Sequence, residues 1–277
     1  MKPQLLLDGL AFGEGPRWHD GQLWLSDMHD HSVLRIGSDG RPEKITTVDA
    51  WPSGLGWLPD GSLLIVAMRD KQVLRFDGSQ THLHADLSDM ASHFCNDMVV
   101  DAHGRAYVGN FGFDLHNRQK PRGAELICVE PDGTARIVAD DLMFPNGSVI
   151  TPDGKTLIVG ETFGNALTAF TIDKNGDLDQ RRSWAPMPDK AVPDGICLDA
   201  GGGIWVASPT TNECLRLLEG GTVSHRIELD RGAYACMLGD NTLYMLASGS
   251  ADPQTCATER SGQVLTVTAP YAGAGLP

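Results

Sequence analysis

The stretch FPNGSVITPDGKTLIVGET, residues 144–162, contains two dipeptides that favour tight turns, Asn146-Gly147 and Asp153-Gly154. They lie only seven residues apart. A chain that reverses direction between two short strands needs one such dipeptide, not two. One of them must therefore serve another purpose, and the rest of the chain indicates which.

A turn containing Gly, Asp or Asn, followed by a short apolar strand, recurs six times along the chain. The copies are HDGQLWLSD (19–27), PDGSLLIVA (59–67), DAHGRAYVGN (101–110), PDGKTLIVGE (152–161), DAGGGIWVAS (199–208) and LGDNTLYMLA (238–247). The turn glycines at 21, 61, 104, 154 and 203 are 40, 43, 50 and 49 residues apart, and a sixth turn lies near Asp240. Each copy has a short strand before it and another after it, and a fourth β-like piece separates the copies.

Four short strands in each unit of about 40–50 residues are typical of a β-propeller blade. Strong helical periodicity is lacking. We therefore predict an all-β fold, a six-bladed β-propeller that forms a single domain over residues 1–277. The last repeat is one strand short, and the N-terminal run PQLLL (3–7) is expected to supply its outer strand. That pairing would close the ring and cover an exposed sheet edge.

Charge and composition narrow the classes of partner. The chain has 277 residues with 22 basic and 36 acidic side chains, a formal net charge of −14. Nucleic acid and anionic membrane surfaces both require a basic face, so neither is expected as a partner. No apolar run approaches the roughly 18 residues of a membrane span. The N-terminus reads as a strand and not as a signal peptide. The composition leaves the oligomeric state open.

The cysteines show no CxxC pair and no zinc spacing. They are Cys95, Cys128, Cys197, Cys214, Cys236 and Cys256. Several fall in apolar strand-like runs, where a free thiol behaves as a small hydrophobe. We expect reduced, buried thiols and a cytoplasmic protein.

Aligning the inner strands on the turn that follows each of them brings six residues to one rim of the channel. They are Glu14, Ser53, Asn96, Asn146, Asp194 and Tyr234. On this alignment Asp153-Gly154 makes the hairpin turn, and Asn146-Gly147 opens an inner strand at the channel mouth. Glycines at 15, 54, 147 and 195 follow four of the rim residues. Lacking a Cβ, they are expected to allow close packing at the axis.

Four of the six rim residues are carboxylates or carboxamides. Two carboxylates drawn together repel each other, so one either takes up a proton or captures a cation. Glu, Asn, Asn and Asp supply hard oxygen donors, which suit Ca²⁺ best, then Mg²⁺ or Mn²⁺. The alternative is that the Asn-Gly and Asp-Gly dipeptides at the rim are ordinary turns. Four carboxylate or carboxamide residues in one register of a sixfold repeat favour a metal site.

Several of these motifs together resemble the SMP-30/gluconolactonase family, also described as gluconolactonase/luciferin-regenerating-enzyme-like. The similarity runs through LAFGEGPRWHDGQLWLSDM, CNDMVVDAHGRAYVG, FPNGSVITPDGKTLIVGET and VPDGICLDAGGGIWVAS to the C-terminus. It implies a six-bladed propeller with one divalent cation at the channel mouth; the oxygen donors favour Ca²⁺ for that cation, and leave Mg²⁺, Mn²⁺ and Zn²⁺ open. It also implies a metal-dependent hydrolase that opens lactone rings, with a small-molecule lactone or ester as substrate.

The resemblance assigns roles to particular residues. Glu14, Asn146 and Asp194 correspond to the protein ligands of the metal, and Asp194 also to the general base that activates water. Asn96 corresponds to a residue that touches metal or substrate, and Asp114 to an acidic substrate contact. Phe94 stands where sugar-lactone members of the family carry an Arg. An apolar lactone or ester would therefore suit Phe94, Phe111 and Phe113 better than a polyhydroxylated one.

Three long segments are expected to converge over this rim as a substrate lid, namely 85–95, 110–123 and 248–260. His29 and His31 are interpreted as exposed loop histidines, and His116 is an outside candidate for substrate contact. No Gly-x-Ser-x-Gly elbow occurs, which argues against serine-triad hydrolysis. Two alternatives remain open: an organophosphate or ester hydrolase on the same metal, and a ligand-binding propeller with no chemistry.

Overall fold

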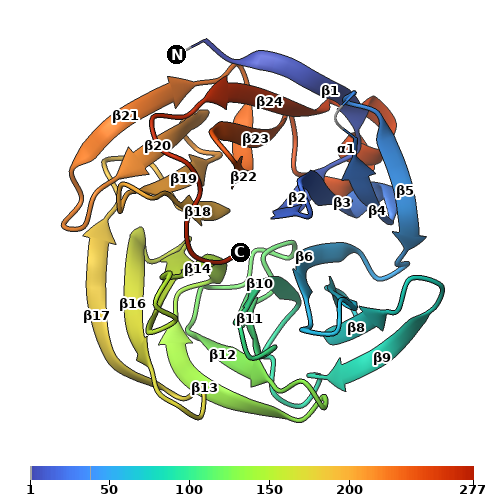
Figure 1. Ribbon diagram of the computed structural model, residues 1–277, viewed down its shortest axis with the longest axis vertical. Coiled ribbons are helices and arrows are strands. Elements are labelled where there is room, and N and C mark those ends of the chain that lie inside the picture. Colours follow the sequence, from blue (N-terminus) through green and yellow to red (C-terminus); the bar gives the residue numbers. More distant parts are fainter. Residues whose placement is uncertain (1, 38) are drawn as a thin grey trace.

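Six four-stranded antiparallel sheets stand around a central axis in the computed structural model (Figure 1), which describes residues 2–37 and 39–277. The predicted six-bladed β-propeller is thereby confirmed. We number the sheets as blades 1 to 6 in chain order. In blades 1 to 5, strand order from the axis outward follows the sequence, and the sixth sheet has the order β22-β23-β24-β1.

The strands of the first three blades are β2 (Gly13–His19), β3 (Gln22–Asp27), β4 (Ser32–Ile36) and β5 (Pro42–Thr47); β6 (Pro52–Trp57), β7 (Leu63–Ala67), β8 (Gln72–Phe76) and β9 (Thr81–Asp86); and β10 (Cys95–Val100), β11 (Ala106–Asn110), β12 (Ala124–Val129) and β13 (Ala135–Leu142). Those of the next two are β14 (Pro145–Ile150), β15 (Thr156–Glu161), β16 (Ala166–Ile172) and β17 (Leu178–Pro186); and β18 (Ile196–Leu198), β19 (Ile204–Ser208), β20 (Glu213–Leu217) and β21 (Val223–Glu228). Blade 6 contains β22 (Gly232–Gly239), β23 (Thr242–Ser248), β24 (Gly262–Thr268) and β1 (Gln4–Leu10). A 3-10 helix, η1 (Met28–Asp30), and an α-helix, α1 (Pro253–Glu259), complete the elements.

The N-terminal strand closes the ring, as the sequence predicted. Strand β1 pairs antiparallel with β24, with Gln4 opposite Thr266 and Leu10 opposite Gly262. Strand β1 consequently lies at the periphery in Figure 1. The outer edge of blade 6 is thus covered by the chain's own first strand.

The two turn-like dipeptides of residues 144–162 have the different roles that the repeat predicted. Gly154 adopts a φ of +69° and donates its N–H to Thr151 O over 2.8 Å, which makes the hairpin turn. Asn146 and Gly147 lie within β14. The prediction for blade 5 was wrong by one residue, because Gly202, not Gly203, has the positive φ of +74°. The longer Gly201–Gly203 run allowed either placement.

The hydrophobic core is divided among the interfaces between blades. Separate buried clusters lie between blades 1 and 2, 2 and 3, 3 and 4, and 4 and 5, and one larger cluster joins blades 5, 6 and 1. All six cysteines are free and buried, as predicted. Among the described residues, no helix is long and apolar enough to cross a bilayer.

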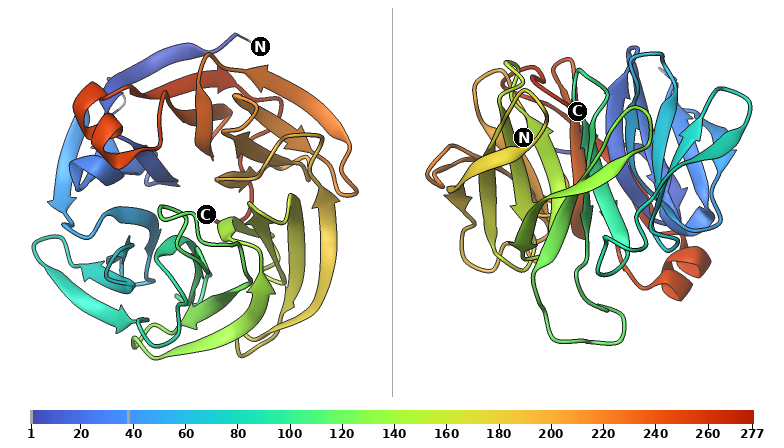
Figure 2. Two further views of the ribbon diagram at one scale, coloured as in Figure 1. Left: turned by 180° about the vertical axis from the view of Figure 1, so that it is seen from behind. Right: turned by 90° about the horizontal axis from the view of Figure 1, so that it is seen from below.

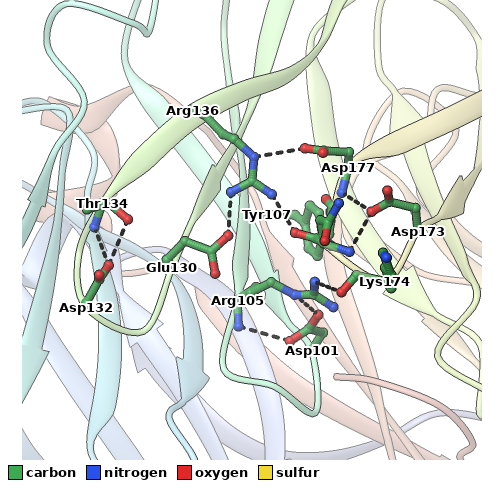
Figure 3. A network of polar contacts seen from close by, with 12 residues as sticks. Asp101, Arg105, Tyr107, Glu130, Asp132, Thr134, Arg136, Asp173, Lys174 and Asp177 are labelled. Carbon is green, nitrogen blue, oxygen red and sulfur yellow. Dashed lines mark hydrogen bonds and ion pairs between the residues drawn. The ribbon is translucent and has the colours of Figure 1, made fainter.

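A polar network ties blades 3 and 4 at the rim that carries the hairpin turns (Figure 3). Arg136 Nε donates to Asp177 Oδ1 over 2.9 Å, and Arg136 also pairs with Glu130. The hydroxyl of the buried Tyr107 donates to Gly176 O over 3.1 Å. These bonds hold the tip of one blade's outer hairpin on its neighbour, away from the residues predicted to bind a metal.

The opposite rim carries the long loops. In the right view of Figure 2, the loop after β11 and helix α1 project from one rim, while the C-terminus lies toward the other. Helix α1 corrects the expectation of a plain loop over 248–260: the Asp252 carboxylate accepts the N–H of Thr255 and Pro253 occupies its first turn. Both features start a helix locally.

Candidate metal centre and substrate cavity

A register shift in the pairing of the inner strand with the second strand recurs in five blades, close to the rim residues. Pairing between first and second strands shifts register between Glu14 and Arg17 in blade 1, and at the equivalent places in blades 2, 3, 4 and 6. Such bulges re-aim a side chain and are common next to active sites. The rim residue is the second residue of the inner strand in blades 1 to 4. Asp194 instead lies two residues before β18.

Glycines allow the inner strands to approach each other just below these residues. A Cβ on Gly15, which has a φ of +52°, would lie 2.4 Å from Ser53 O in the next blade. One on Gly147 would lie 2.5 Å from the Ile196 N–H nitrogen of blade 5. Gly54 and Gly195 are equally confined by the blades that follow them. The close packing predicted at the axis is confirmed.

One cavity of about 590 Å³ opens at this rim, and five of the six predicted rim residues line it. They are Glu14, Asn96, Asn146, Asp194 and Tyr234. Ser53 is buried, is not among the lining residues, and its Oγ has no hydrogen-bond partner in the described part of the chain. The structure therefore brings together the oxygen-bearing side chains of blades 1, 3, 4 and 5.

Asn146 and Asp194 are joined directly across two blades. Asn146 Nδ2 donates to Asp194 Oδ1 over 2.6 Å, and also contacts Thr162 Oγ1 at 3.2 Å. Thr162 in turn donates to Pro193 O over 2.8 Å, which ties the end of β15 to the segment before β18. Since its nitrogen is engaged, the Asn146 amide has its oxygen available for a cation or a substrate.

Two buried carboxylates of the cavity, Glu14 and Asp194, are electrostatically unfavourable without a positive charge beside them. Burial raises the pKa of Glu14 well above its usual value, and the nearby Asp194 and Asp97 raise it further. Burial also raises the pKa of Asp194 to about 8, although the hydrogen bond from Asn146 acts in the opposite direction. A positive charge beside them would stabilise the ionised form of both side chains.

A buried ion pair that was not predicted from the sequence joins the inner strands of blades 1 and 3. Arg17 NH2 pairs with Asp97 Oδ1 at 2.6 Å, and both residues are buried. The same guanidinium donates to Leu55 O and Pro16 O over 2.8 and 2.7 Å. A signal was present in the sequence. Each blade has one residue three positions after its rim residue, and of these six residues Arg17 alone is charged.

The donor set fits a hard divalent cation. Two buried carboxylates with raised pKa values and two amides bring oxygens into one cavity, and no thiol or imidazole is needed. Such oxygen donors suit Ca²⁺ and Mg²⁺. Across the described residues no group of three or more His, Cys, Asp or Glu is arranged to hold a metal. A site here therefore depends on the carboxamides as well as the carboxylates.

Asp114 takes a different position from that of the rim residues. Its carboxylate accepts the N–H and the Nδ2 of Asn117, at 3.0 and 2.7 Å, within its own loop. It is not one of the residues that line the cavity, whereas the next two, Leu115 and His116, are. His93 Nε2 lies 3.9 Å from Asp114 Oδ2. A role for Asp114 in substrate contact would thus be exerted through the shape of this loop.

His29 was expected to be an exposed loop histidine, and that expectation was wrong. It is buried in η1, lines the cavity and packs edge-on against Trp51, with ring centroids 4.9 Å apart. Burial lowers its pKa to about 4, so the imidazole is neutral near pH 7. Its burial depends on Trp51 and Phe12 from other parts of the chain, which a local pattern does not show.

Two of the three predicted lid segments reach the cavity. Leu115 and His116 of the loop after β11, and Ala251, Asp252 and Pro253 before and at the start of α1, are among its lining residues. The third segment, 85–95, contributes Phe94 to the surrounding aromatic packing. Of the three phenylalanines predicted near the substrate, Phe111 lines the cavity, and Phe113 and Phe94 pack around it.

Comparison with known proteins gives matches over most of the chain. The family described as SMP-30/Gluconolactonase/LRE-like region matches residues 12–249. Pentonolactonase XacC of Haloferax volcanii is 27% identical over 199 residues, 70% of this chain and 66% of that protein, just under two thirds of its length. The 6-deoxy-6-sulfogluconolactonase of Pseudomonas putida is 28% identical over 227 residues, 79% of this chain and 76% of that protein. A solved structure of the calcium-binding protein regucalcin from Agrobacterium tumefaciens shares the fold, with a TM-score of 0.80 at 20% identity over 98% of this chain and 94% of that chain.

Proposed function

Because the chain belongs to the SMP-30/gluconolactonase/LRE-like family, we propose that it is a divalent-metal-dependent hydrolase that opens a lactone ring at the rim cavity. The observation that carries the proposal is the meeting of Glu14, Asn146 and Asp194 in one cavity. Two relatives of this chain are named as lactonases, and a protein of the same fold is described as calcium-binding. Ca²⁺ is accordingly the proposed cation.

Glu14, Asn146 and Asp194 would hold the cation through side-chain oxygens. When bound there, it would supply the positive charge that polarises the lactone carbonyl and stabilises the oxyanion formed on water attack. Asn96 faces the same cavity from blade 3 and contacts either the cation or the substrate. Glu14 Oε2 also accepts the N–H of Gly15 at 3.2 Å, which fixes the orientation of its carboxylate.

Asp194 is the proposed general base. Asn146 holds its Oδ1, so the second carboxylate oxygen is the one that takes a proton from water. The water oxygen bonds to the carbonyl carbon, the ring C–O bond breaks, and the departing oxygen accepts the proton that Asp194 took from water, which regenerates the base. Tyr234 lines the same cavity, and burial raises its pKa to about 12, so its hydroxyl keeps its proton at neutral pH and is able to donate a hydrogen bond.

The test is acid release measured with a pH indicator. Protein freed of metal with a chelator is assayed with γ- and δ-lactones, aryl esters and phosphotriesters, before and after addition of Ca²⁺. The proposal predicts lactone opening that requires the added cation. Hydrolysis of phosphotriesters alone would instead favour an organophosphate hydrolase. Binding of lactones without acid release would favour a non-enzymatic propeller.

A further inference from the structure

A second layer of side chains in the repeat lies immediately upstream of the oxygen donors. The residues two positions before the rim residues of blades 1 to 4 are all aromatic: Phe12, Trp51, Phe94 and Phe144. The equivalent positions in blades 5 and 6 are Val192 and Gly232. The repeat therefore encodes an aromatic layer next to the polar one, over four consecutive blades.

The same backbone hydrogen bond fixes this layer in each of those four blades. The N–H of the residue that follows the second strand donates to the carbonyl of the aromatic residue: Met28 to Phe12, Met68 to Trp51, Phe111 to Phe94 and Thr162 to Phe144, over 2.8 to 3.1 Å. All four of these donors line the cavity. Three of the four carry apolar side chains, so the apolar surface extends beyond the aromatic positions.

Two of the aromatic residues are held in a backbone conformation that bulky side chains rarely adopt. Trp51 has a φ of +63° and Phe144 a φ of +65°. Such a conformation costs free energy and persists where the surrounding structure imposes it, commonly at functional sites. The placement of these two rings at the cavity is thus maintained against a local preference.

Ring contacts continue around most of the mouth. Phe12 contacts Tyr234 at 4.7 Å, His29 contacts Trp51 at 4.9 Å, Phe111 contacts Phe144 at 4.3 Å and Phe144 contacts Phe163 at 5.5 Å between centroids. His116 lies between Trp51 and Phe111, at 6.1 and 6.4 Å. We call this set the aromatic collar; it comprises Phe12, His29, Trp51, Phe94, Phe111, His116, Phe144, Phe163 and Tyr234.

The charges that line the cavity all have the same sign. Glu14, Asp194 and Asp252 are its acidic residues, and of the described residues no Lys or Arg lines it. Even with one divalent cation bound, the cavity would offer no Lys or Arg side chain to a sulfonate, phosphate or carboxylate group of a substrate. At the mouth, Leu115 and Phe163 are 38% and 40% exposed, which leaves apolar surface uncovered where a substrate enters.

We propose that the substrate is an uncharged lactone that carries an aromatic substituent, which the collar binds while the carbonyl faces the oxygen donors. This proposal rests on the lactonase function proposed above. It differs from what the names of the relatives suggest, because pentonolactones and sulfogluconolactones are polyhydroxylated or anionic. The collar offers such molecules mostly ring faces, and its polar groups include the Tyr234 hydroxyl and the imidazoles of His29 and His116.

The collar can be tested by binding, independently of turnover. The probe is 3-phenylcyclopentanone, in which a CH₂ replaces the ring oxygen of an aryl lactone so that it is not hydrolysed, with cyclopentanone as its control. Trp51 is the tryptophan that lines the cavity, so its fluorescence reports occupancy, and Trp51→Phe shows which part of the signal it gives. We expect the phenyl compound to bind at least about 10-fold tighter than cyclopentanone.

Matched variants locate the binding surface. Leu115→Ala and Phe163→Ala shorten exposed side chains of the mouth. Each should weaken binding of the phenyl probe about fivefold. Leu83→Ala is the control, since Leu83 is 58% exposed on β9 and does not line the cavity. An equal loss of affinity in Leu83→Ala, or no loss in the two mouth variants, would overturn the collar as the binding surface.

Kinetics separate this inference from the function on which it rests. With Ca²⁺ present, γ-phenyl-γ-butyrolactone should have a lower KM than γ-butyrolactone and a higher kcat/KM than glucono-δ-lactone. Preference for glucono-δ-lactone would overturn the substrate class and leave the lactonase proposal standing. If the phenyl ketone binds at Trp51 but no lactone is opened, the lactonase proposal fails while the aromatic specificity of the cavity is supported.

Discussion

Asn146 of blade 4 donates its Nδ2 hydrogen to Asp194 Oδ1 of blade 5 over 2.6 Å. This bond determines which atoms of the two side chains are engaged and which are free for a ligand. The amide nitrogen is engaged, which leaves the Asn146 oxygen for a ligand, and the carboxylate retains one oxygen that Asn146 does not hold. A carboxylate oxygen has more than one lone pair, so Oδ1 can meet a cation as well as the Asn146 N–H, while the second oxygen stays free to accept a proton.

Replacing the proposed base tests this assignment. Asp194→Asn preserves shape but removes the basic oxygen, so we expect kcat for lactone opening to fall about 10²- to 10⁴-fold. Initial rates measured at saturating Ca²⁺ give the change, with thermal melting as the check on folding. A folded variant that keeps near wild-type kcat would exclude Asp194 as the base.

Glu14→Gln tests whether the Glu14 carboxylate is a ligand of the cation. A neutral amide in place of the carboxylate should weaken Ca²⁺ binding by at least about 10- to 100-fold, since even the loss of a residue that merely supports a ligand costs that much. Isothermal titration calorimetry measures the affinity. Ser53→Ala is the matched control, because Ser53 occupies the same register in blade 2 but does not line the cavity. Equal Ca²⁺ affinity in wild type and Glu14→Gln is the result that contradicts the assignment.

Stability without metal should depend on pH through the same pair. The pKa of Asp194 is raised to about 8 and that of Glu14 is raised well above its usual value. Between about pH 4 and pH 8 the folded protein therefore holds protons that the unfolded chain has lost, so the pair's contribution to the free energy of unfolding falls as pH rises. A bound cation favours the ionised carboxylates and should reverse this loss.

The measurement is Tm at pH 5 and pH 8 in chelator, for wild type and for the double variant Glu14→Gln/Asp194→Asn. Neutral amides do not titrate, so the wild type should lose more Tm than the variant between these values of pH. Added Ca²⁺ should raise the wild-type Tm most at pH 8. An identical pH dependence of Tm in the two proteins would show that Glu14 and Asp194 are not its source.

Two arginines in different surroundings should differ in what they contribute to stability. Arg17→Met leaves the buried Asp97 unpaired and should cost about 3–5 kcal/mol. Arg136 is a third exposed and pairs with partly exposed acids, so Arg136→Met should cost about 1 kcal/mol or less and leave kcat unchanged. Urea unfolding gives both values. Similar losses in the two variants would contradict the role given to burial.

The fold was predictable because its information is local and repeated. A turn glycine, a short apolar strand and a fixed spacing are each weak signals, and six copies make them specific. The rim residues followed from the same register, which is why Glu14, Asn96, Asn146 and Asp194 could be chosen from sequence.

What the sequence did not reveal depends on contacts between distant segments. His29 is buried because Phe12 and Trp51 pack against it from two different blades. Helix α1 is only seven residues long, too short for a periodic pattern to be recognised. Asp114 has the residue type of a substrate contact, yet its position within the loop is set by its bonds to Asn117.

The most direct test is a crystal structure of the protein grown with Ca²⁺. We expect one strong density peak at the propeller rim, about 2.3–2.6 Å from side-chain oxygens of Glu14, Asn146 and Asp194. A calcium ion bound elsewhere, with no ion between these three residues at saturating Ca²⁺, would contradict the account.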